Sequence, residues 1–184
     1  MTLIGHSIIK LHAQPFKKVF PLSPNGTRYL TKSKFKMALE CPTKLFYADH
    51  KAEYFDKNQD NDFLQSLADG GHQIGELAKF KYHPSPISER ITIESLGYEE
   101  SIAQTNDRLN SGARVVVAEA AIKSGVFFIR VDILIFDRLK KTIEVIEVKS
   151  KSIKEQTVQN GFLNSKGNYE TEWLPYLYDI AFQA

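Results

Sequence analysis

The pattern of apolar and polar positions changes character along the chain. Within residues 29–109, three stretches place apolar residues three and four positions apart, which predicts helices. Between residues 115 and 150, dense apolar runs are separated by short polar turns, which predicts strands. Residues 173–183 return to a helical pattern. Helices followed by strands and a last helix favour an α+β domain with helices against a sheet.

The segment after Tyr29 is expected to form the first helix. Thr31 or Ser33 can cap its N-terminus, and Pro42 is expected to kink it or to divide it into two short helices. Residues 1–28 are rich in proline and show no sustained period, so we expect an arm or hairpin that covers a core.

A second helix is expected to begin at Asp62, where Gln65 follows at the spacing of a capping box. It contains three glycines that each cost ~1 kcal/mol relative to alanine in a helix interior. We therefore expect another element to approach this helix closely at Gly70, Gly71 and Gly75. A third helix is expected from about Tyr98 to Leu109.

Three strands are expected at Val115–Ile122, Val126–Phe136 and Thr142–Ser150. Their connections are short, which predicts an antiparallel three-strand meander. A further short strand is expected at residues 90–93.

Composition narrows the class of protein. The 184 residues fit one domain, and 42% hydrophobic with 25% charged residues argue against disorder. A single cysteine, Cys41, excludes a disulfide framework within the chain. We find neither a secretory signal nor an apolar run of the ~18 residues that a membrane span needs, so we expect a cytoplasmic protein with no membrane partner. The net charge of +2 neither requires nor excludes a polyanionic partner.

Charged residues interrupt the predicted strands. Asp132 lies among large apolar residues in the second strand, and Glu147 and Lys149 alternate with apolar residues in the third, on the same face as Val145. A buried carboxylate is costly unless it is paired or bound to a metal, so these positions require an explanation.

One explanation is a site for a hard cation. Asp132 and Glu147 would supply oxygen ligands to Mg²⁺, and the carbonyl of Val148 could be a third. The ion would activate a water for phosphodiester hydrolysis, Lys149 would stabilise the developing negative charge, and Glu76 on the second helix would assist. The other explanation is structural: a buried ion-pair network that also includes Arg130, or an edge strand whose charges face water.

Four stretches in this order resemble the PD-(D/E)xK nuclease superfamily. The likeness is greatest to RecB/Cas4-like nucleases and to bacterial proteins of the DUF2779 type. It rests on LTKSKF with CPTKLFY (residues 30–47), GHQIGE (71–76), Asp132 with Glu147-Val148-Lys149, and YDIAFQ (178–183).

The resemblance implies a restriction-endonuclease-like core with a central mixed sheet. It implies a metal-dependent nuclease in which the acids bind Mg²⁺ or Mn²⁺ and Lys149 assists catalysis. His72 resembles a histidine that some members use as a further ligand, or it is a structural or solvent-facing histidine. The substrate would be DNA or, less often, RNA. A catalytically inactive module that binds nucleic acid or protein on the same fold is the alternative.

The resemblance also bears on an iron–sulfur cluster and on the extent of the domain. Cas4-like members bind an iron–sulfur cluster through four cysteines, so Cys41 alone cannot hold one. We expect a nuclease-like domain over residues 29–184. The last motif would place a tyrosine beyond Ala184, so we expect the domain to be truncated, with a C-terminal domain or partner chain beyond it.

Several residues keep two interpretations. Glu119 is an accessory ligand or the cross-strand partner of Arg130. Gln183 contacts nucleic acid, orders Lys149, or is an ordinary surface residue. Lys32 and Lys34 belong to a basic cluster that follows phosphates or is only solvated.

Overall fold

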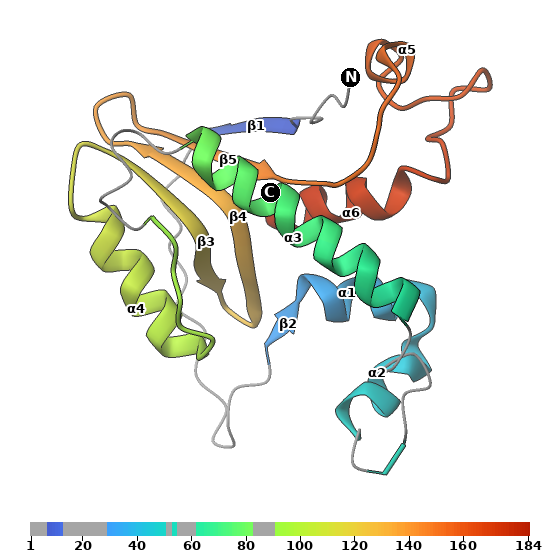
Figure 1. The fold of residues 1–184 in the computed structure, drawn as a ribbon, viewed down its shortest axis with the longest axis horizontal. Coiled ribbons are helices and arrows are strands. Elements are labelled where there is room, and N and C mark those ends of the chain that lie inside the picture. Colours follow the sequence, from blue (N-terminus) through green and yellow to red (C-terminus); the bar gives the residue numbers. More distant parts are fainter. Residues whose placement is uncertain (1–6, 13–28, 51–52, 55–61, 83–90) are drawn as a thin grey trace.

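The structure, a computed structural model, describes residues 7–12, 29–50, 53–54, 62–82 and 91–184 (Figure 1). These residues form one mixed sheet flanked by helices, which confirms the α+β class. In the part of the chain that is described, no helix combines the length and apolar character that a membrane span requires.

The sheet has five strands in the order β1–β5–β4–β2, with β3 also paired to β4. β3 runs antiparallel along the whole of β4, so β5 and β2 share the other edge of β4. β5 pairs antiparallel with residues 133–137 and β2 pairs parallel with residues 127–128. The strands are β1 (Ser7–His12), β2 (Leu30–Thr31), β3 (Arg114–Ser124), β4 (Phe127–Asp137) and β5 (Thr142–Glu147).

The predicted antiparallel meander is confirmed as β3–β4–β5, with one difference. β5 ends at Glu147 instead of Ser150 because the next backbone N–H, that of Val148, donates to the carboxylate of Asp132. Of the short strand expected at residues 90–93, the described residues 91–93 form only a single parallel bridge, between Thr92 and Ala118, and residue 90 lies outside the described residues.

The expected N-terminal arm contributes to the sheet. Residues 7–12 form β1, which pairs antiparallel with β5 so that Ser7 lies opposite Glu147. The other residues of the arm, 1–6 and 13–28, lie outside the described residues.

The predicted helices are present. Thr31 caps α1 through its side chain, which accepts from the backbone N–H of Lys34, and Pro42 begins α2, so the predicted division at Pro42 is confirmed. The capping box expected at the start of α3 involves side chains outside the described set. α5 was not predicted. The helices are α1 (Lys32–Glu40), α2 (Pro42–Asp49), α3 (Asp62–Tyr82), α4 (Tyr98–Leu109), α5 (Glu155–Gln159) and α6 (Leu174–Gln183).

The two faces of the sheet bury separate apolar clusters. One packs against α4 and α6 through Leu109 and Phe182, and the other packs against the end of α3 through Tyr82. In Figure 1, α3 crosses in front of the sheet.

The alternation of buried side chains along β3 shifts by one residue in mid-strand. Val115 and Val117 share a cluster with Ala120, whereas Ala118 belongs to the cluster on the other face. The residue at the shift is Glu119, whose φ of 57° is left-handed and unusual for a residue other than glycine. Such backbone strain persists where the surrounding structure enforces it and is frequent at functional sites.

Candidate active site

Three carboxylates occupy one level across three neighbouring strands. The register pairs Ala118 with Ile133 and Ala120 with Val131, which places Glu119 opposite Asp132. It also pairs Ile133 with Ile146, which places Asp132 opposite Glu147. These three positions lie at the end of the β4–β5 pairing, beyond which β5 no longer pairs with β4. The sheet therefore brings the two predicted strand acids, Asp132 and Glu147, together at the point where β4 and β5 separate.

Asp132 is half-buried and is held by the backbone. Its Oδ2 accepts the N–H of Val148 at 2.6 Å. Burial and the neighbouring charge of Glu147 raise the pKa of Asp132 to about 6, against the opposing effects of the Val148 bond and of Lys32 and Lys149. A carboxylate with a raised pKa lacks sufficient positive charge nearby, and a bound cation would supply it.

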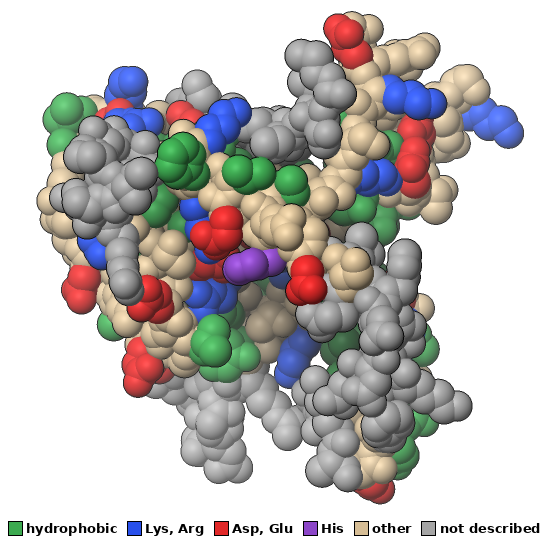
Figure 2. All heavy atoms as spheres, in the orientation of Figure 1, with side chains coloured by type: hydrophobic (Ala, Val, Ile, Leu, Met, Phe, Trp, Pro, Cys, Tyr) green, Lys and Arg blue, Asp and Glu red, His purple; other side chains and the backbone are tan. Residues whose placement is uncertain are grey.

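Asp132 opens into a cavity of about 150 Å³ beneath α3. Figure 2 shows acidic, basic and histidine side chains gathered on the face that α3 crosses. The cavity brings together five residues predicted from the sequence, since its lining consists of Gly71, His72, Gly75, Glu76, Lys79, Glu119, Asp132, Ile133 and Val148. Glu76 therefore lines the same cavity as two strand acids, Asp132 and Glu119.

Lys79 is a member of this cavity that the sequence analysis missed. Its Nζ lies 2.9 Å from Oε1 of Glu76 and 3.7 Å from Oε1 of Glu119. The hydrogen bond from Lys79 lowers the pKa of Glu76 despite partial desolvation. The available signal was the spacing of three residues between Glu76 and Lys79 on a predicted helix.

Glu119 also satisfies the cross-strand interpretation. Its Oε2 lies 3.6 Å from Nε of Arg130, whose guanidinium donates to the carbonyls of Ser95 at 2.7 Å and Ile93 at 2.8 Å. Glu119 thus links Arg130 to Lys79 while lining the cavity of Asp132. The pairing with Arg130 is confirmed, and a role as an accessory ligand stays a prediction.

Glu147 is 5% exposed and accepts hydrogen bonds from three side chains. Lys32 Nζ lies 2.8 and 2.9 Å from its two carboxylate oxygens, Lys149 Nζ lies 2.5 Å from Oε1, and Gln183 Nε2 donates to Oε2 at 2.8 Å. Burial alone would raise the pKa of Glu147, but the two lysines outweigh it and the pKa is lowered. Glu147 is therefore ionised at neutral pH.

Lys149 is shared between Glu147 and a second buried acid, Asp179. Its Nζ lies 2.8 Å from Oδ2 of Asp179, which is fully buried and also pairs with Lys36 at 3.1 Å. Burial opposes the charged ammonium, but the bonds to Asp179 and Glu147 raise the pKa of Lys149 above its usual value. Asp179 was not among the site residues expected from the sequence, although a lone charge among the apolar residues of YDIAFQ was a visible signal.

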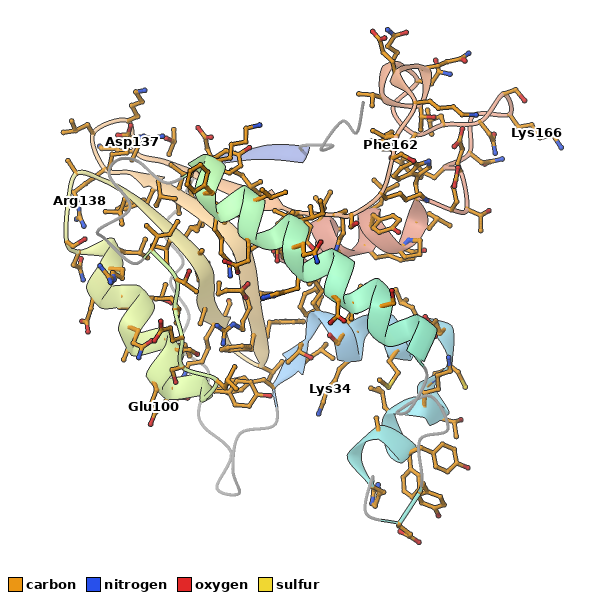
Figure 3. The ribbon with its side chains drawn as sticks, in the orientation of Figure 1. Lys34, Glu100, Asp137, Arg138, Phe162 and Lys166 are labelled. Atoms are coloured by element: carbon orange, nitrogen blue, oxygen red, sulfur yellow. The ribbon has the colours of Figure 1, made fainter. Side chains whose placement is uncertain are left out.

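Two of the three residues predicted to bind nucleic acid lie at this network, since Lys32 and Gln183 both contact Glu147. Gln183 is buried, so its interpretation as an ordinary surface residue is wrong, whereas a contact of Gln183 with nucleic acid stays a prediction. Lys34 lies on α1, where Figure 3 labels it. Lys44, on α2, pairs with Glu40 at 2.6 Å on the surface.

The acids are divided between two sets of contacts. Asp132, Glu76 and His72 line the cavity beneath α3, whereas Glu147 is turned toward lysines and Gln183. Accordingly, no group of three or more His, Cys, Asp or Glu side chains among the described residues is arranged to hold a metal ion. Mg²⁺ commonly takes only one or two protein carboxylates and completes its shell with waters and substrate phosphate. The hard oxygen donors of Asp132, Glu147 and Val148 therefore fit that ion in chemical type.

The glycines of α3 do not mark a close approach, contrary to expectation. A Cβ built at Gly70, Gly71 or Gly75 meets no described atom within 4 Å. Gly71 and Gly75 instead line the cavity that contains Asp132. Glycine destabilises a helix, but at Gly71 and Gly75 a larger side chain would take up space in this cavity.

Comparisons with known proteins found no match: no protein-family model, no curated protein and no solved structure matches this chain.

Proposed function

We propose that this chain is a metal-dependent nuclease with a restriction-endonuclease-like core, which hydrolyses phosphodiester bonds in DNA or RNA. The observation that carries the proposal is the placement of Asp132 opposite Glu147 where β5 leaves β4, with Lys149 two residues farther on. The cavity shared by Asp132, His72 and Glu76 adds support, because separate elements converge there.

The cation would be Mg²⁺ or Mn²⁺, held by Asp132 and Glu147 with the carbonyl of Val148 and with His72 as further donors. When bound, such an ion polarises a phosphodiester oxygen and acidifies a coordinated water. Binding would require Glu147 to exchange part of its contact with Lys32 and Lys149, both of which keep some exposure to solvent.

Lys149 is suited to stabilise negative charge. Its raised pKa keeps the ammonium protonated at neutral pH, which makes it unsuitable as a general base. Asp179 fixes its position, so the ammonium is preorganised for charge that develops on the phosphate in the transition state. Glu76 and Lys79 form a second charged pair at the cavity, where Glu76 can orient water.

The second candidate is a non-catalytic module that binds nucleic acid or protein. It is favoured by one observation, the closed network in which Glu147 contacts Lys32, Lys149 and Gln183. A catalytically inactive protein of this fold would be expected to retain such a network.

A cleavage assay tests the proposed function. End-labelled single- and double-stranded DNA and RNA would be incubated with the wild type in Mg²⁺, Mn²⁺ or EDTA, beside Asp132→Asn. We expect cleavage that requires the cation and is lost in Asp132→Asn. A folded wild type that binds the oligonucleotides without cutting any of them in either cation would refute the nuclease and favour the binding module.

Gly75→Ala is expected to separate stability from activity. A methyl group at this position meets no described atom within 4 Å, so the gain in helix propensity should raise the free energy of unfolding by ~0.5–1 kcal/mol. The same methyl is added to the wall of the cavity at Asp132 and should lower the cleavage rate.

Gly70→Ala is the matched control, because Gly70 lies in the same helix with equal free space but outside the cavity lining. It should stabilise the protein to a similar extent and leave cleavage unchanged. Equal rates for the two variants in the assay, with both stabilised in urea unfolding, would show that this wall does not face the substrate.

A further inference from the structure

A second cavity, of about 240 Å³, lies against α6 on the side of the site where Glu147 meets Lys149. Its walls are mostly aromatic and aliphatic. The lining includes Glu147, Lys149, Lys151, Phe162, Trp173 and Tyr176. Phe162 lies on the segment that connects α5 to α6 (Figure 3).

Three aromatic rings form one part of this wall. The centroid of Trp173 lies 5.5 Å from that of Phe162 and 5.7 Å from that of Tyr176, with the planes inclined at 58° and 50°. Rings at these angles do not stack on one another face to face. They leave surfaces suited to a planar aromatic guest.

Trp173 carries an unused hydrogen-bond donor. Its side chain is 8% exposed, and its Nε1 has no hydrogen-bond partner among the described residues. A buried indole N–H normally finds an acceptor, because leaving it unpaired is destabilising. A guest that brings a carbonyl oxygen or a ring nitrogen would supply one.

The charges at the cavity favour a guest that carries phosphate. Lys151 Nζ lies 4.0 Å from the ring centroid of Trp173 and 5.0 Å from that of Tyr176, and Lys149 Nζ lies 5.9 Å from that of Tyr176. The carboxylate of Glu147 is paired with Lys32 and Lys149, and Lys151 also pairs with Glu172 at the surface, at 3.1 Å. Two ammonium groups disfavour a cationic guest, which an aromatic cage would otherwise accept.

We propose that this cavity receives one unpaired nucleobase of the substrate. The base would lie next to the phosphate whose negative charge Lys149 stabilises. This inference rests on the proposed nuclease function, because it assigns the adjoining cavity to the nucleic-acid strand that the nuclease would cut. The base stacks on the aromatic wall and accepts from Nε1 of Trp173, while Lys151 meets the flanking phosphate. A base in a duplex is stacked and paired, so only a single-stranded or extruded nucleotide can enter.

The test uses the wild-type protein and its only tryptophan. A short single-stranded oligodeoxynucleotide is titrated with Ca²⁺ in place of Mg²⁺, and the emission of Trp173 is recorded together with the anisotropy of a label on the DNA. We expect the single strand to quench Trp173 and a blunt duplex of the same sequence to leave its emission unchanged. Binding without quenching, equal quenching by the duplex, or no binding of the single strand would each overturn the proposal.

Tyr176→Ala provides a second measurement. Loss of one stacking partner should weaken binding of the single strand roughly 5- to 100-fold. The matched control is Tyr169→Ala, an exposed tyrosine of the preceding segment that lies outside the lining. It should bind like the wild type, and equal binding by both variants would overturn the proposal.

The two proposals fail in different ways. Quenching by the single strand in a protein that cuts nothing in Mg²⁺ or Mn²⁺ would refute the nuclease and leave a base-binding cavity. Metal-dependent cleavage without any change in Trp173 emission would leave the nuclease and refute the base-binding cavity.

Discussion

Lys149→Met should lower kcat for phosphodiester hydrolysis by ~10²–10³-fold, the loss that follows removal of one preorganised donor in other enzymes. Methionine keeps the length and the apolar contacts of the lysine stem but removes the ammonium that lies between Glu147 and Asp179. Cation binding should persist, because the carboxylates that would hold the ion are unchanged. The measurement is single-turnover cleavage at saturating Mg²⁺.

The control for this variant is Lys44→Met. Lys44, on α2, is also an ion-paired lysine, but its partner is Glu40 at the end of α1 and both side chains are exposed. It should cut at the wild-type rate. A Lys149→Met protein that is folded and cuts as fast as the wild type would remove Lys149 from the mechanism.

Asp132→Asn should abolish cleavage and, at the same time, stabilise the fold by about 1–3 kcal/mol near pH 8. In the folded protein, burial and Glu147 raise the pKa of Asp132 to about 6, from 3.8 for the unperturbed group. The ionised carboxylate is thus a source of instability that asparagine removes, while the amide oxygen can still accept from Val148. Urea unfolding of both proteins across pH measures the difference.

The sign of the pH dependence follows from the direction of the shift. The folded state holds the Asp132 proton more tightly than the unfolded state, so this group's contribution to stability is fully present below pH ~4 and is lost as the pH rises through 6. The advantage of Asp132→Asn should therefore grow from pH 4 to pH 7 and then remain constant.

Asp137→Asn is the matched control on the same strand. The carboxylate of Asp137 accepts the N–H of Lys140 at 2.9 Å and also pairs with the side chain of that lysine at 3.8 Å, so removing its charge brings no such gain. An Asp132→Asn protein that is no more stable than the wild type at pH 8 would show that the ionised carboxylate of Asp132 does not destabilise the folded protein.

The sequence predicted the parts of the fold that depend on local pattern. The α3 and α4 helices, the β3–β4–β5 meander and the division at Pro42 follow from periodicity, turn residues and the geometry of proline. Part of the site was predictable for the same reason. Alternation along the strand expected at Thr142–Ser150 places Glu147 and Lys149 on one face, and in the structure both contact residues of α6.

The remaining features depend on contacts between distant segments. The left-handed backbone of Glu119 follows no strand propensity, and it shifts the alternation on β3. Asp179 pairs with Lys149 across 30 positions of sequence, and Lys32 reaches Glu147 across 115, so neither partner could be chosen from spacing. The glycines of α3 were expected to allow a close approach of another element, whereas in the structure they leave space in a cavity.

Binding of Mn²⁺ at pH 8 tests the central claim most directly, since it asks whether the strand acids hold a cation at all. Electron paramagnetic resonance of free Mn²⁺ would be followed during titration with the wild type, Asp132→Asn and Lys149→Met. We predict that the wild type and Lys149→Met deplete the free signal and that Asp132→Asn does not. Depletion to the same extent by Asp132→Asn, or no depletion by a folded wild type, would contradict a metal-dependent site at Asp132 and Glu147.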